Sequence, residues 1–378
     1  MKVAIVHDWL YTYAGAEKVL EQMLICFPDA DLFSLIDFMP ENARSFLYGK
    51  KVRTSFIQRM PFAKNKHRHY LPLMPFAIEQ FDLRKYDLVI SSSHAVAKGV
   101  LTGPHQLHIC YCHSPIRYAW DMQHQYLEES NLTHGIKSLL SRYLLHRIRL
   151  WDYRTANGVD YFIANSKFIA SRIKKVYRRE SEVIHPPVNI DKFALSTLPR
   201  ENFYLTASRL VPYKKISLIA ASFRKMTDLK LKIVGVGPDE TKIKEIIKGA
   251  PNIEYLGFVK DDELVLLMQK AKAFVFAAEE DFGIIPVEAQ ACGTPVIAYK
   301  RGGTVETVVD TPENLQTGAF FTEQSVDSIV DTIIRFERSS SIQPKTCREN
   351  AEKFSELMFR SRFIKFVTDC YQKFMNQA

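Results

Sequence analysis

The sequence of 378 residues has no apolar run long enough to cross a bilayer, and its six cysteines include no Cys-x-x-Cys pair. The first absence argues against a membrane-spanning helix. The second argues against a disulfide framework and predicts reduced, buried thiols. The N-terminus also lacks a signal-peptide pattern and begins directly with an apolar strand, so we expect a cytoplasmic protein.

Acidic residues are in deficit, which leaves a formal net charge of +9 at pH 7. The excess lies in the first half, because residues 1–192 hold 26 Lys and Arg against 18 Asp and Glu, whereas the remainder holds 25 against 24. Nucleic acid, an anionic membrane surface or a diphosphate-bearing acceptor would each suit such a charge. No RNA- or DNA-binding motif accompanies it, so we expect no nucleic-acid partner.

Two domains are expected, because a chain of this length exceeds what one hydrophobic core usually supports. Short apolar runs alternate with helical patterns along the chain, which predicts an α/β protein with parallel sheets. We place the first domain at residues 1–190, the second at residues 198–355 and a final amphipathic helix at residues 356–378.

The most informative segment joins two apolar runs, residues 273–277 and 295–299, which indicate buried parallel strands. Between them, Pro286 fits the first position of a helix and Gly293 fits its C-terminal stop. The loop of residues 280–285 is therefore expected at the carboxyl end of a strand and the amino end of a helix. Open α/β sheets bind ligands there, and free N–H groups at such a place favour anions.

Two glutamates belong to this segment. Glu280 lies on the loop and Glu288 in the first helical turn, and both can face one crevice. A carboxylate beside a phosphate is repelled, so these two side chains are better suited to sugar hydroxyls. A plain strand–helix turn with two solvated acids is the alternative for a lone pair of glutamates.

The complete string EDFGIIPVEAQACGTP, residues 280–295, is more specific. It resembles the Glu-x7-Glu signature of the large group 1 (family 4) class of retaining GT-B glycosyltransferases, which use nucleotide sugars. Asp281 stands where that family usually has glycine. The resemblance implies contacts to the donor sugar from Glu280 and the amides near Gly283 and Ile284, and a contact to the ribose from Glu288.

A second family element follows the strand predicted over residues 203–207. The string RLVPYK, residues 209–214, matches the spacing of the family's pyrophosphate-binding Arg and Lys. Arginine offers a planar fork and lysine a point charge. The resemblance therefore implies that Arg209 and Lys214 neutralise the leaving diphosphate, with no metal ion or other cofactor. Isolated basic residues are otherwise more often solvated.

Two glycine-containing loops also take a role from the resemblance. The string AGAEKV, residues 14–19, resembles the family's Gly-Gly-x-Glu loop, with alanine at the first glycine, and this implies that Gly15 lies near the donor diphosphate. An ordinary glycine in a strand–helix loop is the alternative. The segment implied near the nucleobase comprises Gly257, Phe258 and Val259.

The string CHSPIRYAWD, residues 112–121, follows the strand predicted over residues 107–112 and resembles bacterial polysaccharide mannosyltransferases of the same family. The resemblance implies that His113 lies beside the donor sugar and the attacking hydroxyl, and a purely structural histidine is the alternative. A zinc site is disfavoured, because alternate residues of a strand stand in a row and do not converge into a tetrahedron. The potential ligands are His105, His108, Cys110, Cys112 and His113.

Two basic segments carry much of the charge excess, residues 64–75 and the helix predicted over residues 139–153. Prolines in the first segment argue against regular structure. The helix is predicted to turn its basic side chains outward and to pack one apolar face on the core, formed by Leu140, Leu144, Ile148 and Trp151. The alternative is contact with an acceptor or an anionic membrane, with the candidates Lys66, Arg68, Arg117, Arg142 and Arg149.

The resemblance covers nearly the whole chain and implies the GT-B architecture, in which two Rossmann-like domains face each other across a cleft and the C-terminal helix crosses back to the first domain. It implies a retaining transfer of a hexose to a lipid-linked saccharide in bacterial surface polysaccharide synthesis, with peripheral contact at the inner face of the cytoplasmic membrane. The likeness around His113 favours mannose from GDP-mannose. The alternatives are UDP-glucose or a deoxysugar nucleotide as donor, and an inactive scaffold subunit of the same fold.

Overall fold

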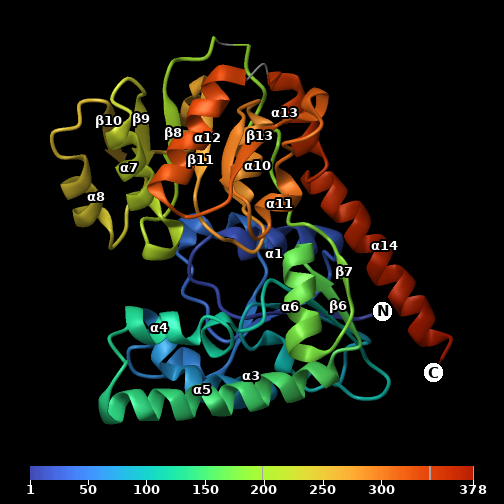
Figure 1. Cartoon of the computed structure of the whole chain (residues 1–378). Helices are drawn as coiled ribbons and strands as arrows, with labels where there is room; N and C mark the ends of the chain where they lie inside the picture. Colours follow the sequence, from blue (N-terminus) through green and yellow to red (C-terminus); the bar gives the residue numbers. More distant parts are fainter. Residues whose placement is uncertain (198, 340–341, 378) are drawn as a thin grey trace. The chain divides into compact units, whose positions relative to one another are not determined.

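The computed structural model describes residues 1–197, 199–339 and 342–377, and the chain forms two compact units (Figure 1). The first unit comprises Met1–Pro186 and Phe359–Ala378, and the second comprises Pro187–Met358. The predicted domain limits at residues 198 and 378 lie outside the described residues. None of the helices that the structure describes has the length and apolar character needed to span a bilayer.

The first unit is built on seven parallel strands in the order β3-β2-β1-β4-β5-β6-β7. The central strands β1, β4 and β5 are buried along their whole length, as expected for strands covered on both faces. The strands are β1 Val3–His7, β2 Asp31–Ser34, β3 Val52–Thr54, β4 Leu88–Ser93, β5 Leu107–Cys112, β6 Tyr161–Ala164 and β7 Ser181–Val183. The helices are α1 Gly15–Cys26, α2 Ala63–Lys66, α3 Met74–Glu79, α4 Gln123–Glu129, α5 Gly135–Thr155, α6 Lys167–Tyr177 and α14 Glu356–Met375.

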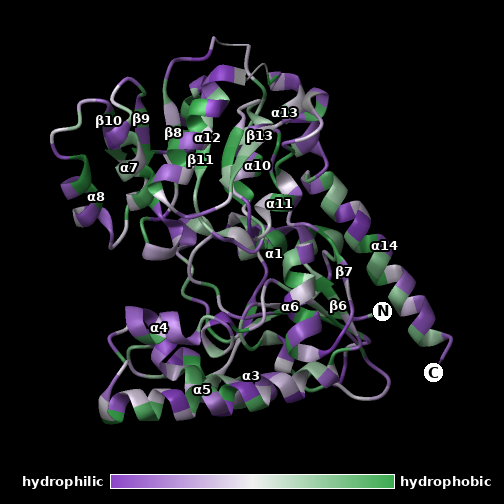
Figure 2. Ribbon diagram, in the orientation of Figure 1, coloured by the Kyte–Doolittle hydropathy of each residue, from purple (hydrophilic) through white to green (hydrophobic). Residues whose placement is uncertain are grey.

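The second unit has six parallel strands in the order β10-β9-β8-β11-β12-β13. Figure 2 shows hydrophobic strands inside this unit, and β8, β11 and β12 are buried throughout. The strands are β8 Tyr204–Ala207, β9 Leu231–Val234, β10 Ile253–Gly257, β11 Ala273–Phe276, β12 Val296–Tyr299 and β13 Gly318–Phe321. The helices are α7 Ile216–Lys225, α8 Glu240–Ile247, α9 Asp261–Lys270, α10 Ile284–Ala291, α11 Thr304–Thr307, α12 Val326–Ser339 and α13 Pro344–Glu352.

The last helix, α14, begins in the second unit and packs on the core of the first. Its buried residues recur at helical spacing and join the cluster that includes Tyr111 of β5. The C-terminal helix therefore crosses back to the first unit, as predicted. The residues that pack there are Phe359, Phe363, Val367 and Cys370.

The prediction that residues 64–75 are irregular is wrong. They form α2, a 3-10 helix over His67–Leu73 and the start of α3. The prolines do not prevent this, because Pro72 lies in a 3-10 turn and Pro75 lies in the first turn of α3, where an amide has no intrahelical partner to lose.

Helix α5 also differs from the prediction, because its outward face is largely apolar. Leu140 is exposed rather than packed on the core, whereas Arg142 and Arg149 are half-buried. Arg149 turns inward to donate to the carbonyl oxygen of Ala119 at 2.7 Å, and Arg142 donates to Ser138 at 3.2 Å. Figure 2 shows hydrophobic segments recurring along the whole length of α5. The apolar pattern predicted the helix and the inward positions of Ile148 and Trp151 correctly, but not the exposure of Leu140 or the inward arginines.

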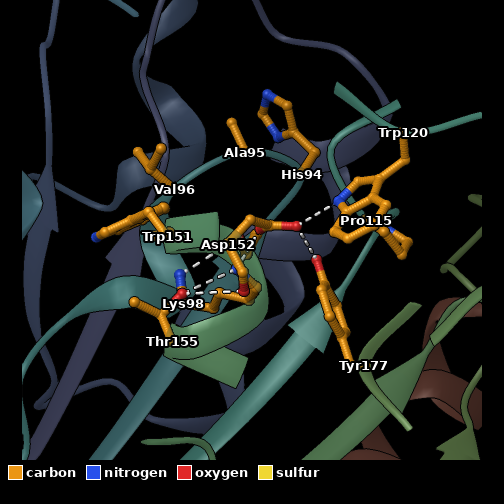
Figure 3. Close-up of polar contacts among 12 residues, drawn as sticks. His94, Ala95, Val96, Lys98, Pro115, Trp120, Trp151, Asp152, Thr155 and Tyr177 are labelled. Carbon is orange, nitrogen blue, oxygen red and sulfur yellow. Dashed lines mark hydrogen bonds and ion pairs between the residues drawn. The ribbon is translucent and has the colours of Figure 1, made fainter. Parts of the chain in front are cut away.

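A buried ion pair fixes α5 to the loop that follows β4 (Figure 3). Lys98 donates to the carboxylate of Asp152, and both side chains are almost wholly excluded from solvent. The other carboxylate oxygen of Asp152 accepts from Trp120 Nε1 at 2.7 Å and from Tyr177 Oη at 2.9 Å. The Lys98 ammonium also lies 5.3 Å from the ring centroid of Trp151. Asp152 therefore joins α5 to three other segments of the first unit.

We expect Lys98→Met to lower the free energy of unfolding of the first unit by about 3–5 kcal/mol, because it leaves a buried carboxylate without its counter-charge. Urea denaturation followed by tryptophan fluorescence measures this unit alone, since all three tryptophans of the chain lie in it. The control is Lys174→Met on α6, whose partner Glu180 is exposed and whose loss is worth less than about 1 kcal/mol. Equal effects of the two substitutions would contradict the importance of the buried pair.

Candidate functional site

An opposite-charge pair lies at the carboxyl ends of two adjacent strands of the second unit. Lys214 ends a 3-10 helix, Pro212–Lys214, after β8, and Glu280 follows β11. The ammonium of Lys214 donates to the Glu280 carboxylate, and their side chains are only 13% and 18% exposed. Sequence reasoning assigned these residues to separate motifs, and the structure brings them together at the sheet edge where α/β folds bind ligands.

Arg209 lies on the same loop as Lys214 but is exposed. Its guanidinium has no hydrogen-bond or ion-pair partner within the described part of the chain. The nearby Lys215 adopts a left-handed backbone conformation with φ +57°, a conformation in which glycine is less strained. The loop therefore presents the unpaired Arg209 and the paired Lys214 at the same end of β8.

The Glu280 loop lies directly on the backbone of Gly302 and Gly303. The amide of Gly303 donates to the carbonyl oxygen of Glu280 at 2.8 Å. A Cβ at Gly302 would lie 2.3 Å from that oxygen, and a Cβ at Gly303 would lie 2.2 Å from the Cα of Phe282. Only glycine fits at these two positions. The Gly-Gly pair therefore sets the position of the loop that carries Glu280.

A second pair of glycines supports the Arg209 loop in the same way. A Cβ at Gly235 would lie 1.8 Å from the carbonyl oxygen of Ser208, and a Cβ at Gly237 would lie 2.2 Å from that of Leu210. The amide of Leu210 donates to the carbonyl oxygen of Val236 at 3.0 Å. Each charged loop thus rests on a glycine-containing turn.

Helix α10 begins at Ile284, two residues before the predicted start at Pro286. Gly283, with φ +83°, is the N-cap, and Pro286 is the third helical residue. That position tolerates proline because the first four amides of a helix have no intrahelical acceptor. The predicted stop is confirmed: Gly293 has φ +82°, and the amide of Thr294 donates back to Ala289 at 2.9 Å.

The remaining donor candidates differ in how accessible they are. Glu288 is buried on α10, and burial together with the nearby Glu288 carboxylate raises the pKa of Cys292 to about 12. Gly257 has φ +69° and Phe258 is 76% exposed, whereas Val259 packs in the hydrophobic core. Phe258 is therefore the residue of its loop that is available for stacking on a ligand.

In the first unit, the carboxylate of Asp8 holds the loop after β4. It accepts four backbone N–H groups, from His94 at 2.6 Å, Ala95 at 2.9 Å, and Val96 and Ala97 at 2.7 Å each. Asp8 is completely buried, so these amides replace the water that its charge would otherwise require. The sequence analysis did not single out Asp8, although its place directly after β1 was a signal.

Beside this loop, His113 joins a hydrogen-bonded group of buried side chains. Its Nε2 lies 2.9 Å from Ser92 Oγ, which lies 3.0 Å from His7 Nδ1. The other nitrogen of His7 lies 3.5 Å from Glu17 Oε1. Sequence reasoning selected His113 but missed His7, Ser92 and Glu17, all of which lie at the carboxyl ends of β1 and β4 or in the first turn of α1.

Gly15 begins α1, and its loop is connected to the same group. The amide of Ala14 donates to Glu17 Oε2 at 3.0 Å. Burial alone would raise the pKa of Glu17, but the hydrogen bond from His7 and the attraction of its ring hold that pKa below the ordinary value. Burial also lowers the pKa of His94, and it lowers that of His113 well below the ordinary value. The site therefore combines the Glu17 carboxylate with two imidazoles, those of His94 and His113, whose pKa values favour the uncharged form.

The potential metal ligands do not gather in one place. His108 is held by Ser91 at 2.9 Å and by the carbonyl oxygen of Gly158 at 3.1 Å, and Cys110 and Cys112 pack in a hydrophobic cluster. The carboxylate of Asp31, the first residue of β2, accepts a hydrogen bond from Tyr86. Among the residues that the structure describes, no group of three or more His, Cys, Asp or Glu side chains is arranged to hold a metal ion.

The acceptor or membrane candidates fall into two classes. Lys66 and Arg68 are exposed, whereas Arg117, Arg142 and Arg149 are half-buried. Because Arg142 and Arg149 bond within their own unit, Lys66 and Arg68 are the more accessible charges.

Two sequence families match the chain, one in each half. Residues 15–192 match the family described as Glycosyltransferase Family 4, and residues 188–354 match Glycosyl transferases group 1. An uncharacterized glycosyltransferase of Methanocaldococcus jannaschii is 26% identical over 243 residues, covering 64% of this chain and 67% of that protein.

Two further proteins are informative. The GDP-mannose-dependent alpha-(1-6)-phosphatidylinositol monomannoside mannosyltransferase of Mycolicibacterium smegmatis is 27% identical over 208 residues, covering 48% of this chain and 53% of that protein. The structure of HepE from Anabaena in complex with UDP superposes with a TM-score of 0.71 at 16% identity, covering 98% of this chain and 100% of that one. HepE has also been solved with UDP-glucose.

Proposed function

Because this chain is a glycosyltransferase of group 1 type with a GT-B fold, we propose that it transfers mannose from GDP-mannose, with retention of configuration, to a lipid-linked saccharide in bacterial surface polysaccharide synthesis. The observation that carries the proposal is the Lys214–Glu280 pair with the unpaired Arg209 beside it. A nucleotide sugar needs cations for its diphosphate and acceptors for its hydroxyls, and this sheet edge offers both.

In the proposed reaction, Arg209 and Lys214 neutralise the charge that develops on the leaving diphosphate. Lys214 exchanges its contact with Glu280 for a phosphate oxygen, and the freed carboxylate of Glu280 accepts hydrogen bonds from the hexose. The amides at Gly283 and Ile284 contribute to the same site. Two cations in this position remove the need for a divalent metal. Glu288 binds the ribose, Phe258 stacks on the base, and Gly15 lies near the diphosphate.

Two observations bear on the identity of the donor. The string around His113 resembles mannosyltransferases, and a relative from Mycolicibacterium smegmatis is GDP-mannose-dependent by name. UDP-glucose is the second candidate, because a structural neighbour has been solved with it. We favour GDP-mannose, because its assignment draws on a sequence match as well as on the fold.

We expect Lys214→Ala to lower kcat by about 10²- to 10³-fold, the usual effect of removing one group that stabilises developing negative charge. We expect Glu288→Ala to weaken nucleotide binding by about 10-fold or more. Release of GDP from GDP-mannose measures the first and calorimetric titration with GDP the second. The control is Lys225→Ala on the exposed surface of α7. Unchanged behaviour of both site variants would refute the site assignment.

The acceptor leads to a proposal about location. A lipid-linked saccharide resides in a membrane, so we propose that the first unit docks peripherally on the inner face of the cytoplasmic membrane through α5. The exposed face of α5 has Ile136 at 87% exposure and Leu139 at 70%, and Arg147 is exposed on the same side. Its one acidic residue, Asp152, is buried against Lys98. An apolar and cationic face suits anionic lipid, whereas a second copy would bring like charges together.

We expect the protein to sediment with vesicles that contain phosphatidylglycerol, and to dissociate as salt concentration rises. Leu139→Glu combined with Leu140→Glu should abolish binding by adding negative charge to the docking face. Leu357→Glu, which changes an exposed leucine of α14, is the matched control. Salt-insensitive binding, or equal loss in the control, would overturn the assignment of this face.

A further inference from the structure

Four buried side chains form a hydrogen-bond chain from Glu17 to His113. The links are Glu17 Oε1 to His7 Nε2 at 3.5 Å, His7 Nδ1 to Ser92 Oγ at 3.0 Å and Ser92 Oγ to His113 Nε2 at 2.9 Å. The four residues come from α1, β1, β4 and the residue after β5. Each has little or no exposed surface, so solvent does not compete for these contacts.

The direction of the chain follows from the carboxylate at its start. Glu17 is ionised and can only accept, so the His7 nitrogen that faces it must carry the proton, even at the long distance of 3.5 Å. In its uncharged form the His7 ring has a single N–H, which leaves Nδ1 as an acceptor. Ser92 then donates to His7 and accepts at its oxygen from His113 Nε2–H. The proton of His113 is thereby assigned to Nε2.

The other nitrogen of His113 is available for a ligand. Nδ1 has no hydrogen-bond partner among the described residues. It also retains some exposure, because it is absent from the fully buried nitrogens that lack a partner. As the unprotonated nitrogen, it can accept a hydrogen bond but cannot donate one. A hydroxyl group is the matching donor.

We propose that Glu17, His7 and Ser92 are positioning residues that hold His113 in the tautomer with protonated Nε2, so that its Nδ1 accepts a hydrogen bond from a sugar hydroxyl. The identity of that ligand rests on the proposed function. The tautomer itself rests only on the hydrogen-bond chain within the first unit. The carboxylate of Asp8 accepts four backbone amides and lies 3.1 Å from Nδ1 of His94. Within the described residues it makes no hydrogen bond to His7 or His113.

The substitution Glu17→Gln gives a sharp test, because it should reverse the direction in which the linked side chains donate their hydrogen bonds. The amide of Ala14 donates to Glu17 Oε2, so the carbonyl oxygen of a glutamine turns to that side and its NH₂ faces His7. Nε2 of His7 must then accept, its Nδ1–H donates to Ser92, and Ser92 donates to His113 Nε2. His113 is left protonated on Nδ1.

Long-range ¹H–¹⁵N spectra of the full chain read the tautomer directly at about pH 8, above the ordinary histidine pKa of about 6.5. We expect a protonated Nε2 on His113 in the native protein, a protonated Nδ1 in Glu17→Gln and a mixture in Ser92→Ala. Glu21→Gln, on the same helix α1, is the control and should leave the tautomer unchanged. A protonated Nδ1 in the native protein, or no change in Glu17→Gln, would overturn the proposal.

Kinetics separate this inference from the proposed function. Glu17→Gln should lower kcat by about tenfold, the value of one hydrogen bond, and leave the Kd for GDP unchanged, because the two cations proposed for the diphosphate, Arg209 and Lys214, lie in the second unit. If the native protein shows the predicted tautomer of His113 but transfers no sugar, the proposed function is wrong and the hydrogen-bond chain still stands. Normal kcat in a Glu17→Gln variant with a reversed tautomer would refute the role assigned to Nδ1.

Discussion

The carboxylate of Asp8 accepts four backbone N–H groups, and the site of the first unit depends on this interaction. A fully buried charge is costly unless it is compensated, so the loop after β4 must bring those amides to one point. The same loop continues to Lys98, which forms a buried ion pair with Asp152. The carboxylates of Asp8, directly after β1, and Asp152, on α5, therefore fix the loop in place. This holds His94, and Ser92 at the end of β4, beside His113.

The second unit uses backbone contact in place of buried charge. Its two functional loops, which carry Arg209 and Glu280, lie against glycines that leave no space for a side chain. Close packing of backbone on backbone permits little displacement. Charged side chains at the strand ends can then approach one another within the unit, as Lys214 and Glu280 do. Backbone packing as well as charge therefore sets the positions of the side chains that we propose for a diphosphate and a sugar.

The sequence predicted most of the strands and the stop of α10 in the second unit, because these features are local. A strand such as β11 is an unbroken apolar run, and the stop of α10 at Gly293 follows from one residue type. The exposure of Leu140 on α5 was not predicted, because leucines occur around much of the helix. The inward positions of Asp152 and Arg149 depend on distant partners. The contact of His7 with Ser92 joins residues 85 positions apart, and no local pattern indicates it.

We propose that the charged carboxyl edge of the second unit binds a guanosine diphosphate sugar, and this is the central claim. Thermal denaturation with GDP, GDP-mannose, UDP and UDP-glucose tests it most directly, because a ligand that binds only the folded state raises Tm. We expect GDP and GDP-mannose to raise Tm in the native protein and to do so less in a variant without Lys214. Stabilisation by the uridine compounds alone would contradict the assigned donor, and no response to any of the four would contradict the central claim.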